Sequence, residues 1–132
     1  MSVESWDPGA ANTRVTADDL ARLLQAAQAL DEPDFGLAEL EVARLAALAR
    51  HPDVDWVEPA ADLGDAELLA LARLFTKAEA AFPSWQAGAK SPVIVLAAEL
   101  RRRGSYPAEL TAWIKANSDN RFLPYGNLMD RL

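Results

Sequence analysis

The positions of glycine and proline constrain the fold of this 132-residue chain most tightly. All six glycines and all eight prolines lie outside the segments that show helical periodicity, or in their first turn. Proline lacks an N–H and clashes with the preceding turn, and glycine in a helix interior costs about 1 kcal/mol relative to alanine. Between these breaks the chain is rich in alanine and leucine and shows no strand alternation. We therefore expect an all-α protein.

Apolar residues recur at helical spacing in five segments, expected as helices at about residues 16–30, 37–50, 65–81, 91–103 and 107–117. The first opens with Thr16 and Asp19 in the arrangement of a capping box. Ser91 is the expected N-cap of the fourth helix, Pro92 takes its first position, and Gly104 supplies a left-handed stop. Helix ends are thus predicted from local chemistry alone.

The connections predict how these helices pack. Loops of about five to fifteen residues are too long for a regular up-down bundle, so a compact, irregular orthogonal bundle is expected. The segment 37–50 is apolar nearly all round, which predicts a central position. Residues 51–61 are expected to form an irregular connection with a short extended piece. Residues 1–15 lack periodicity and are expected to be a flexible arm, leaving 16–132 as one helical domain.

The composition excludes several kinds of site. There is no cysteine, so disulfides, thiolate nucleophiles and cysteine-based metal centres are ruled out. His51, the only histidine, precedes a proline at a helix end, where it is expected to bond the last carbonyls. No nucleotide, dinucleotide or calcium motif is present, and no cofactor or metal is expected. No apolar run approaches the roughly 20 residues of a membrane span, and the first residues lack the features of an export signal. A cytoplasmic protein without membrane contact is therefore expected.

Charge is distributed unevenly along the chain. The net charge is −7, but residues 1–89 hold six basic against sixteen acidic residues and residues 90–132 hold seven against four. An acidic protein repels nucleic acid, so a nucleic-acid partner is not expected. The basic final third either packs beside acidic helices or forms a docking face for an acidic protein partner, with Arg101, Arg102 and Arg103 as its candidate residues.

The segment 116–127 differs from everything before it. Amides, a carboxylate, a guanidinium and two aromatic rings gather there, and we expect an ordered, non-helical C-terminal segment. Glu79 and Asn117 lie on or beside the buried stripes of their helices, where a carboxylate needs a partner or its pKa rises. In one interpretation Asn117 and Asn120 cap a helix and bond the loop backbone, and Arg121 pairs with Glu79 or another acidic residue. Phe122, Leu123 and Tyr125 then fill the groove between helices.

A second interpretation leaves this groove open as a pocket for an anion or a small polar ligand. The N-terminus of the helix after Ser91, with Lys90 beside it, is a plausible anion site in its own right. The candidate ligand-binding residues are Lys77, Glu79, Trp85, Lys90, Ser91, Asn117, Asn120, Arg121 and Tyr125.

Several segments, Phe75–Glu79, Ala89–Ile94 and Asp119–Gly126 among them, are similar to those of a family of small hypothetical proteins found in Gram-negative bacteria. The resemblance covers roughly the C-terminal half. It implies a bacterial, cytoplasmic protein and carries over no functional residue.

Two functional hypotheses follow from the sequence. The first is a non-catalytic domain that binds a protein partner through its basic final third. The second is a small anionic-ligand-binding protein with a polar groove around Glu79 and Arg121. An enzyme that uses Glu79 or Asp119 as acid or base ranks third, because no catalytic partner stands at a defined spacing. Catalytic residues are therefore not assigned.

Overall fold

The computed structural model describes residues 15–50 and 55–124. Within them the protein is all-α, as predicted, with six α-helices and no strand. The helices are α2 (Ala17–Ala27), α3 (Glu39–Arg50), α4 (Val57–Asp62), α5 (Asp65–Ala81), α6 (Pro92–Arg103) and α7 (Leu110–Asn117). Three short 3₁₀ turns are η2 (Pro33–Gly36), η3 (Pro83–Trp85) and η4 (Gly88–Lys90). Residues 1–14 of the arm predicted at 1–15 lie outside the described residues.

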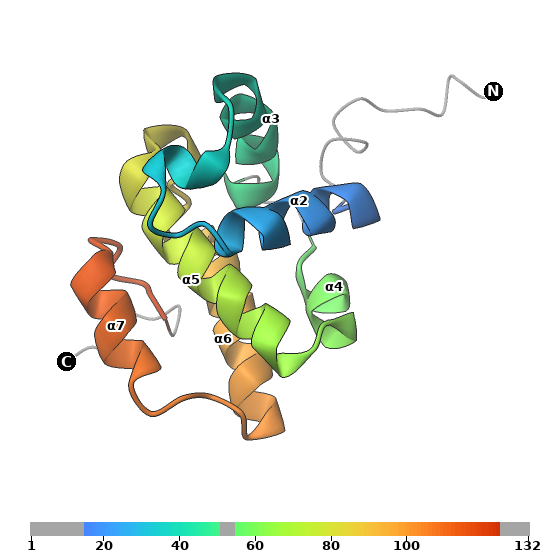
Figure 1. Ribbon diagram of the computed structural model, residues 1–132. Coiled ribbons are helices and arrows are strands. Elements are labelled where there is room, and N and C mark those ends of the chain that lie inside the picture. Colours follow the sequence, from blue (N-terminus) through green and yellow to red (C-terminus); the bar gives the residue numbers. More distant parts are fainter. Residues whose placement is uncertain (1–14, 51–54, 125–132) are drawn as a thin grey trace.

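Helix α5 forms the centre of an irregular bundle (Figure 1). It packs against α6, α2 and α7, and its buried residues lie on several of its faces. The prediction that segment 37–50 is central was wrong. Leu40 of α3 is 84% exposed, and Ala43 is exposed as well. Alanine side chains make a helix apolar, but they are too small to fill the space around a helix at the centre of a bundle.

The connection before α5 also differs from the prediction. Residues 57–62 form the short helix α4 instead of an extended piece, with Pro59 tolerated in its first turn. Trp56 is buried at the start of this helix and donates its indole N–H to the carbonyl of Leu48 at 3.0 Å. That bond satisfies one of the carbonyls left open at the end of α3 and ties α4 to it.

The helix ends follow the capping chemistry. Thr16 accepts a hydrogen bond from the backbone N–H of Asp19 at 3.1 Å and starts α2. Ser91 is the N-cap of α6, and Gly104 ends that helix in the left-handed conformation at φ 74°. Helix α2 stops at Ala27, shorter than expected, and the chain reverses through η2, where Phe35 is buried.

Aromatic rings fill the core at one end of α5. Phe75 contacts Trp56 edge-on, with centroids 5.3 Å apart, and lies 5.8 Å from Trp85. Phe82 joins Trp85 to Phe35 through two further edge contacts. The Trp85 indole N–H donates to the carbonyl of Val42 at 2.9 Å, which holds α3 against η3. This cluster fixes the last turn of α5, where Glu79 lies.

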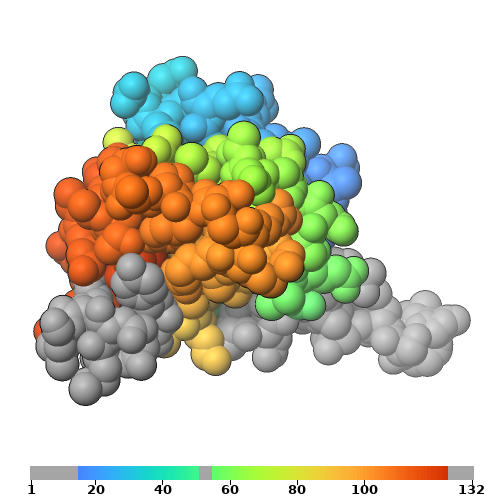
Figure 2. Space-filling model, turned by 90° about the horizontal axis from the view of Figure 1, so that it is seen from below, coloured from blue at the N-terminus to red at the C-terminus, as the bar shows by residue number. Residues whose placement is uncertain are grey.

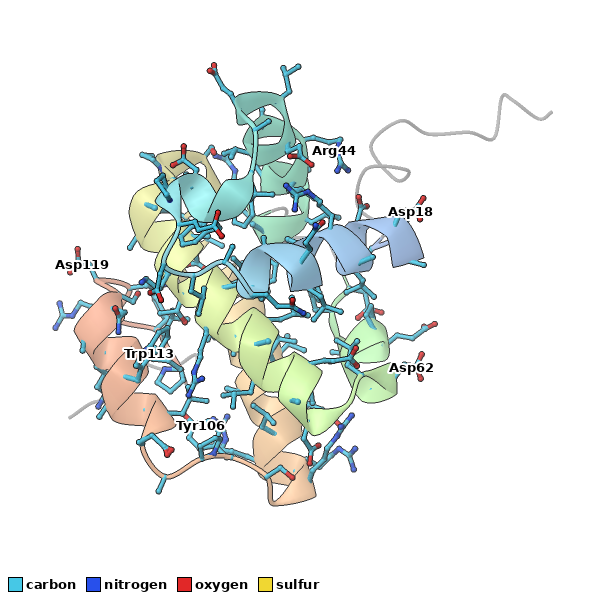
Figure 3. All side chains as sticks on the ribbon, viewed as in Figure 1. Asp18, Arg44, Asp62, Tyr106, Trp113 and Asp119 are labelled. Atoms are coloured by element: carbon cyan, nitrogen blue, oxygen red, sulfur yellow. The ribbon has the colours of Figure 1, made fainter. Side chains whose placement is uncertain are left out.

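Helix α7 packs against α5 as well. Trp113 points from α7 toward α5 (Figure 3), and the guanidinium of Arg73 lies over its ring at 5.7 Å. The side chain of Arg73 is half-buried. Figure 2 shows the face where α4 lies beside α6. Within the described residues, no helix combines the length and the apolar character that crossing a membrane requires.

Candidate functional site

Glu79 is the one carboxylate that is buried among the residues that the structure describes. It lies in the last turn of α5 and is only 3% exposed, because the aromatic cluster and the start of α6 enclose that turn. Its carboxylate accepts hydrogen bonds from the Ser91 hydroxyl, from the Asn120 amide at 3.4 Å and from the backbone of Ala87. Three segments that are distant in sequence therefore meet at this one side chain.

Burial raises the pKa of Glu79 to about 7, and the hydrogen bonds from Ser91, Asn120 and Ala87 oppose that rise. None of the ion pairs formed within the described residues includes Glu79. Glu41 and Glu99 behave in the opposite way, because hydrogen bonds from Arg22 and Arg102 lower the pKa of each to about 2. Glu79 is thus a carboxylate held by neutral donors.

Ser91 serves both the helix and the site. Its hydroxyl oxygen accepts the backbone N–H of Val93 at 3.2 Å, which caps α6, and its hydroxyl proton points to Glu79. The carboxylate of Glu79 thus lies beside the N-cap of the helix at whose N-terminus the sequence predicts an anion site. Lys90, expected beside it, is exposed.

Asn120 anchors the segment 118–124 to the rest of the molecule. Its side-chain amide donates to the carbonyl of Gly88 at 2.9 Å as well as to Glu79, and its side-chain oxygen accepts the N–H of Phe122 at 2.9 Å. Leu123 follows with no exposed surface. Of the segment predicted to be non-helical, Ala116 and Asn117 still belong to α7, whereas residues 118–124 are non-helical and place Leu123 in the core.

The expected pairing of Arg121 with Glu79 is corrected by this geometry. Asn120 reaches the carboxylate, whereas the neighbouring Arg121 is exposed. Adjacent residues in an irregular segment point in different directions, and no periodicity in the sequence tells which one turns inward.

A pocket of about 390 Å³ opens beside Glu79. Its wall consists of Glu79 and Ala80 from α5, Gln86 and Gly88 from the loop before α6, and residues 118–122. Polar side chains thus line it from three segments, and Phe122, half-buried, supplies an aromatic surface. Gln86 was missed from the sequence, where a single polar residue in a loop carries no signal.

A second pocket of about 490 Å³ shares Ala80, Ser118 and Asp119 with the first. Lys77, Lys115 and Asn117 line it, together with Phe35. Figure 3 shows Asp119, which lines both pockets, at the end of α7 with its carboxylate directed outward.

The structure brings together only part of the set predicted to bind a ligand. Glu79, Asn120 and Arg121 share the first pocket, whereas Lys77 and Asn117 belong to the second. Trp85 is fully buried in the aromatic cluster and lines neither pocket. Asn117 donates its amide to the carbonyl of Trp113 at 2.8 Å and so closes the end of α7. Tyr125 lies outside the described residues.

The three arginines predicted to bind a partner have different surroundings. Arg103 pairs with Asp65 at 3.0 Å and Glu99 at 2.7 Å, and it donates to the carbonyls of Ala60 and Ala61 at the end of α4. Arg103 therefore joins α4, α5 and α6.

Arg102 pairs with Glu99 at 2.5 Å, and the Arg101 guanidinium lies over the ring of Tyr106 at 5.6 Å. Arg101 and Arg102 remain exposed at the end of α6.

No group of three or more histidine, cysteine, aspartate or glutamate side chains within the described residues is arranged to hold a metal ion. The chain matches no protein-family model, no curated protein and no solved structure. The resemblance to small proteins of Gram-negative bacteria stays a prediction, and the site is interpreted from its own geometry.

Proposed function

We propose that this protein binds a small polar molecule in the pocket beside Glu79. The observation that carries the proposal is the position of this carboxylate, 3% exposed, in the wall of a pocket of about 390 Å³. Pockets for small molecules commonly have volumes of about 300–1,000 Å³ and combine apolar surface with a few placed polar groups. Titratable groups with strongly shifted pKa values also concentrate at functional sites.

The side chains around the pocket are held in place by the fold. Asn120 makes hydrogen bonds to Gly88, Glu79 and Phe122, and Ser91 holds Glu79 from the α6 side. A ligand would meet groups that are already oriented, so little ordering would oppose its binding. Side chains held by hydrogen bonds are typical of a binding site, whereas an incidental hollow in the surface is usually bordered by mobile side chains.

A thermal-shift screen of small polar metabolites tests the proposal. A true ligand at 100 times its dissociation constant stabilises the folded protein by about 2.7 kcal/mol. The wall variant Gln86→Ala should weaken this stabilisation, since Gln86 is exposed in the pocket wall. Arg50→Ala is the control, because Arg50 is an exposed residue that lines neither pocket.

Ligands whose effect is lost in Gln86→Ala and kept in Arg50→Ala support the pocket. A set of ligands that stabilise all three proteins equally would place binding elsewhere and contradict the proposal.

A protein partner at the end of α6 is a second candidate function. It is favoured by the exposure of Arg101 and Arg102 in the basic final third of an acidic chain. The double variant Arg101→Glu/Arg102→Glu leaves Arg103 and its contacts intact. A partner held at this face should be lost from pull-downs with the double variant and retained with Arg50→Glu/Lys115→Glu. Equal recovery with both variants would exclude this face.

A further inference from the structure

We propose that the ligand of this pocket carries a cationic group, an ammonium or a guanidinium, which pairs with the carboxylate of Glu79. This inference rests on the proposed function and names the chemical class of the ligand. It reverses the charge expected from the sequence, where Lys77 and Lys90 were counted among the pocket residues. Neither lysine lines the pocket beside Glu79.

The first argument is the set of partners that Glu79 has. Those that lie within residues 15–50 and 55–124 are all neutral: a hydroxyl, a side-chain amide and a backbone group. Elsewhere in the structure glutamates with several hydrogen bonds receive them from arginines, as Glu41 does from Arg22 at 2.6 Å and 3.0 Å. A buried carboxylate without a cation is costly when ionised, and a ligand that supplies the cation removes much of this cost.

The second argument is the balance of charge in the pocket wall. Two carboxylates, Glu79 and Asp119, line it against one guanidinium, that of the exposed Arg121. The whole chain has a net charge of −7, so its field draws cations toward the surface. An anion in the pocket would meet the carboxylate of Glu79, which lies against Ser91, the N-cap of α6.

The third argument is the aromatic surface beside the carboxylate. The half-buried ring of Phe122 lines the same pocket. Aromatic rings attract cations through their negative faces, with larger effects where water is excluded. A carboxylate and an aromatic ring in one wall are groups that recognise an amine attached to an apolar body.

Binding of a cation is coupled to the ionisation of Glu79. With a pKa near 7 this group holds its proton in slightly acidic solution, and the cation requires it to lose that proton. Among the described residues, the charged groups that line the pocket with it are Asp119 and Arg121, whereas Lys77 of α5 lines the second pocket and Lys90 of η4 is exposed. The α6 side contributes Ser91, which is uncharged, and α6 has no charged residue in its first turn.

Three probes of matched shape distinguish the charge classes. Benzylamine is cationic, benzamide neutral and benzoate anionic, and each carries a ring for the Phe122 surface. Titrations followed by amide NMR shifts should show benzylamine perturbing Gly88, Asn120 and Phe122 with the highest affinity. Its affinity should rise about tenfold from pH 6 to pH 8, as a pKa near 7 for the required carboxylate dictates.

The variant Glu79→Gln keeps the shape of the side chain and removes its charge. It should lose most of the affinity for benzylamine together with the pH dependence of that affinity. Glu58→Gln is the matched control, since Glu58 is an exposed glutamate of α4 that lines neither pocket, and it should behave as the wild type.

The inference that the ligand is cationic would be overturned if benzoate bound more tightly than benzylamine. It would also be overturned if the affinity for benzylamine increased as the pH falls. If none of the probes moves these amides although a metabolite from the screen does, the binding function stands and the cation inference fails. If no compound of either set acts at the pocket, both fail.

Discussion

At the scale of single residues, burial without a cationic partner determines the behaviour of Glu79. The folded protein raises its pKa to about 7 from an ordinary value of 4.5, so the folded state binds this proton more tightly than the unfolded chain does. The favourable contribution is complete below about pH 4.5 and is lost as the pH rises to about 7. Above about pH 7 the ionised carboxylate of Glu79 therefore lowers the stability of the folded protein, and at the same pH it carries the charge that can pair with a cationic ligand.

We expect Glu79→Gln to stabilise the protein at pH 8, by an amount on the order of 3 kcal/mol, because a shift of one pKa unit corresponds to about 1.4 kcal/mol. Near pH 4.5 the two proteins should have similar free energies of unfolding. Denaturant melts at both pH values measure this difference. Glu99→Gln is a control for which we expect the opposite change in stability. Arg102 lowers the pKa of Glu99, so removing the Glu99 carboxylate should destabilise the folded protein at neutral pH. A Glu79→Gln variant that is less stable than wild type at pH 8 would contradict the argument.

At the scale of helices, the N-caps show how one hydroxyl can serve two purposes. Thr16 caps α2 at an exposed position, whereas the buried Ser91 caps α6 and also donates to Glu79. Thr16→Ala should cost about 1 kcal/mol. Ser91→Ala should cost about 2–3 kcal/mol, because the carboxylate also loses a donor.

The pH dependence separates these two effects. The Ser91 hydrogen bond lowers the pKa of Glu79, so its removal should raise that pKa further and make the Ser91→Ala cost larger at pH 8 than at pH 5. The Thr16→Ala cost should be the same at both. Thermal melts of the two variants across this range make the comparison, and equal, pH-independent costs would show that Ser91 acts only as a cap.

The junction of α4, α5 and α6 depends on Arg103. This side chain binds two carboxylates and two carbonyls, whereas the neighbouring Arg102 binds Glu99 alone and is 69% exposed. Arg103→Ala should therefore lower the melting temperature clearly more than Arg102→Ala does. A larger effect of Arg102→Ala in differential scanning calorimetry would refute this role for Arg103.

At the scale of the whole molecule, the segment 118–124 completes the core as well as the pocket. Leu123 has no exposed surface, so Leu123→Ala should cost about 2–5 kcal/mol through a new cavity. Phe122→Ala should cost less, because that ring is half-buried in the pocket wall, and it should weaken ligand binding. Chemical denaturation of both variants tests the order, and a neutral Leu123→Ala would mean that the segment is not part of the cooperative fold.

The helices and most of their ends could be predicted because caps, glycines and prolines act locally. Thr16, Ser91, Pro92 and Gly104 each mark a boundary through chemistry that involves only a few neighbouring residues. Which helix is central could not be predicted. The many apolar residues of α3 show its composition, but they do not show which other helices pack against it. Its Leu40 is largely exposed for that reason.

The candidate site was predicted in part. The position of Glu79 beside the apolar stripe of its helix identified it as a carboxylate in need of a partner, and burial in the structure agrees with that periodicity. The partner itself lies in an irregular segment, where Asn120 and Arg121 are equally good candidates without coordinates. Gln86 and the division into two pockets depend on tertiary packing, which local patterns do not encode.

The account depends on a buried carboxylate, that of Glu79, for which the described part of the chain supplies no cationic partner. A pH titration of the Glu79 side-chain carboxyl by carbon-13 NMR measures this directly. The account predicts a midpoint near 7 in the free protein, falling when benzylamine saturates the pocket. A midpoint at or below 4.5 in the free protein would show that Glu79 is already compensated, and it would contradict the central claim.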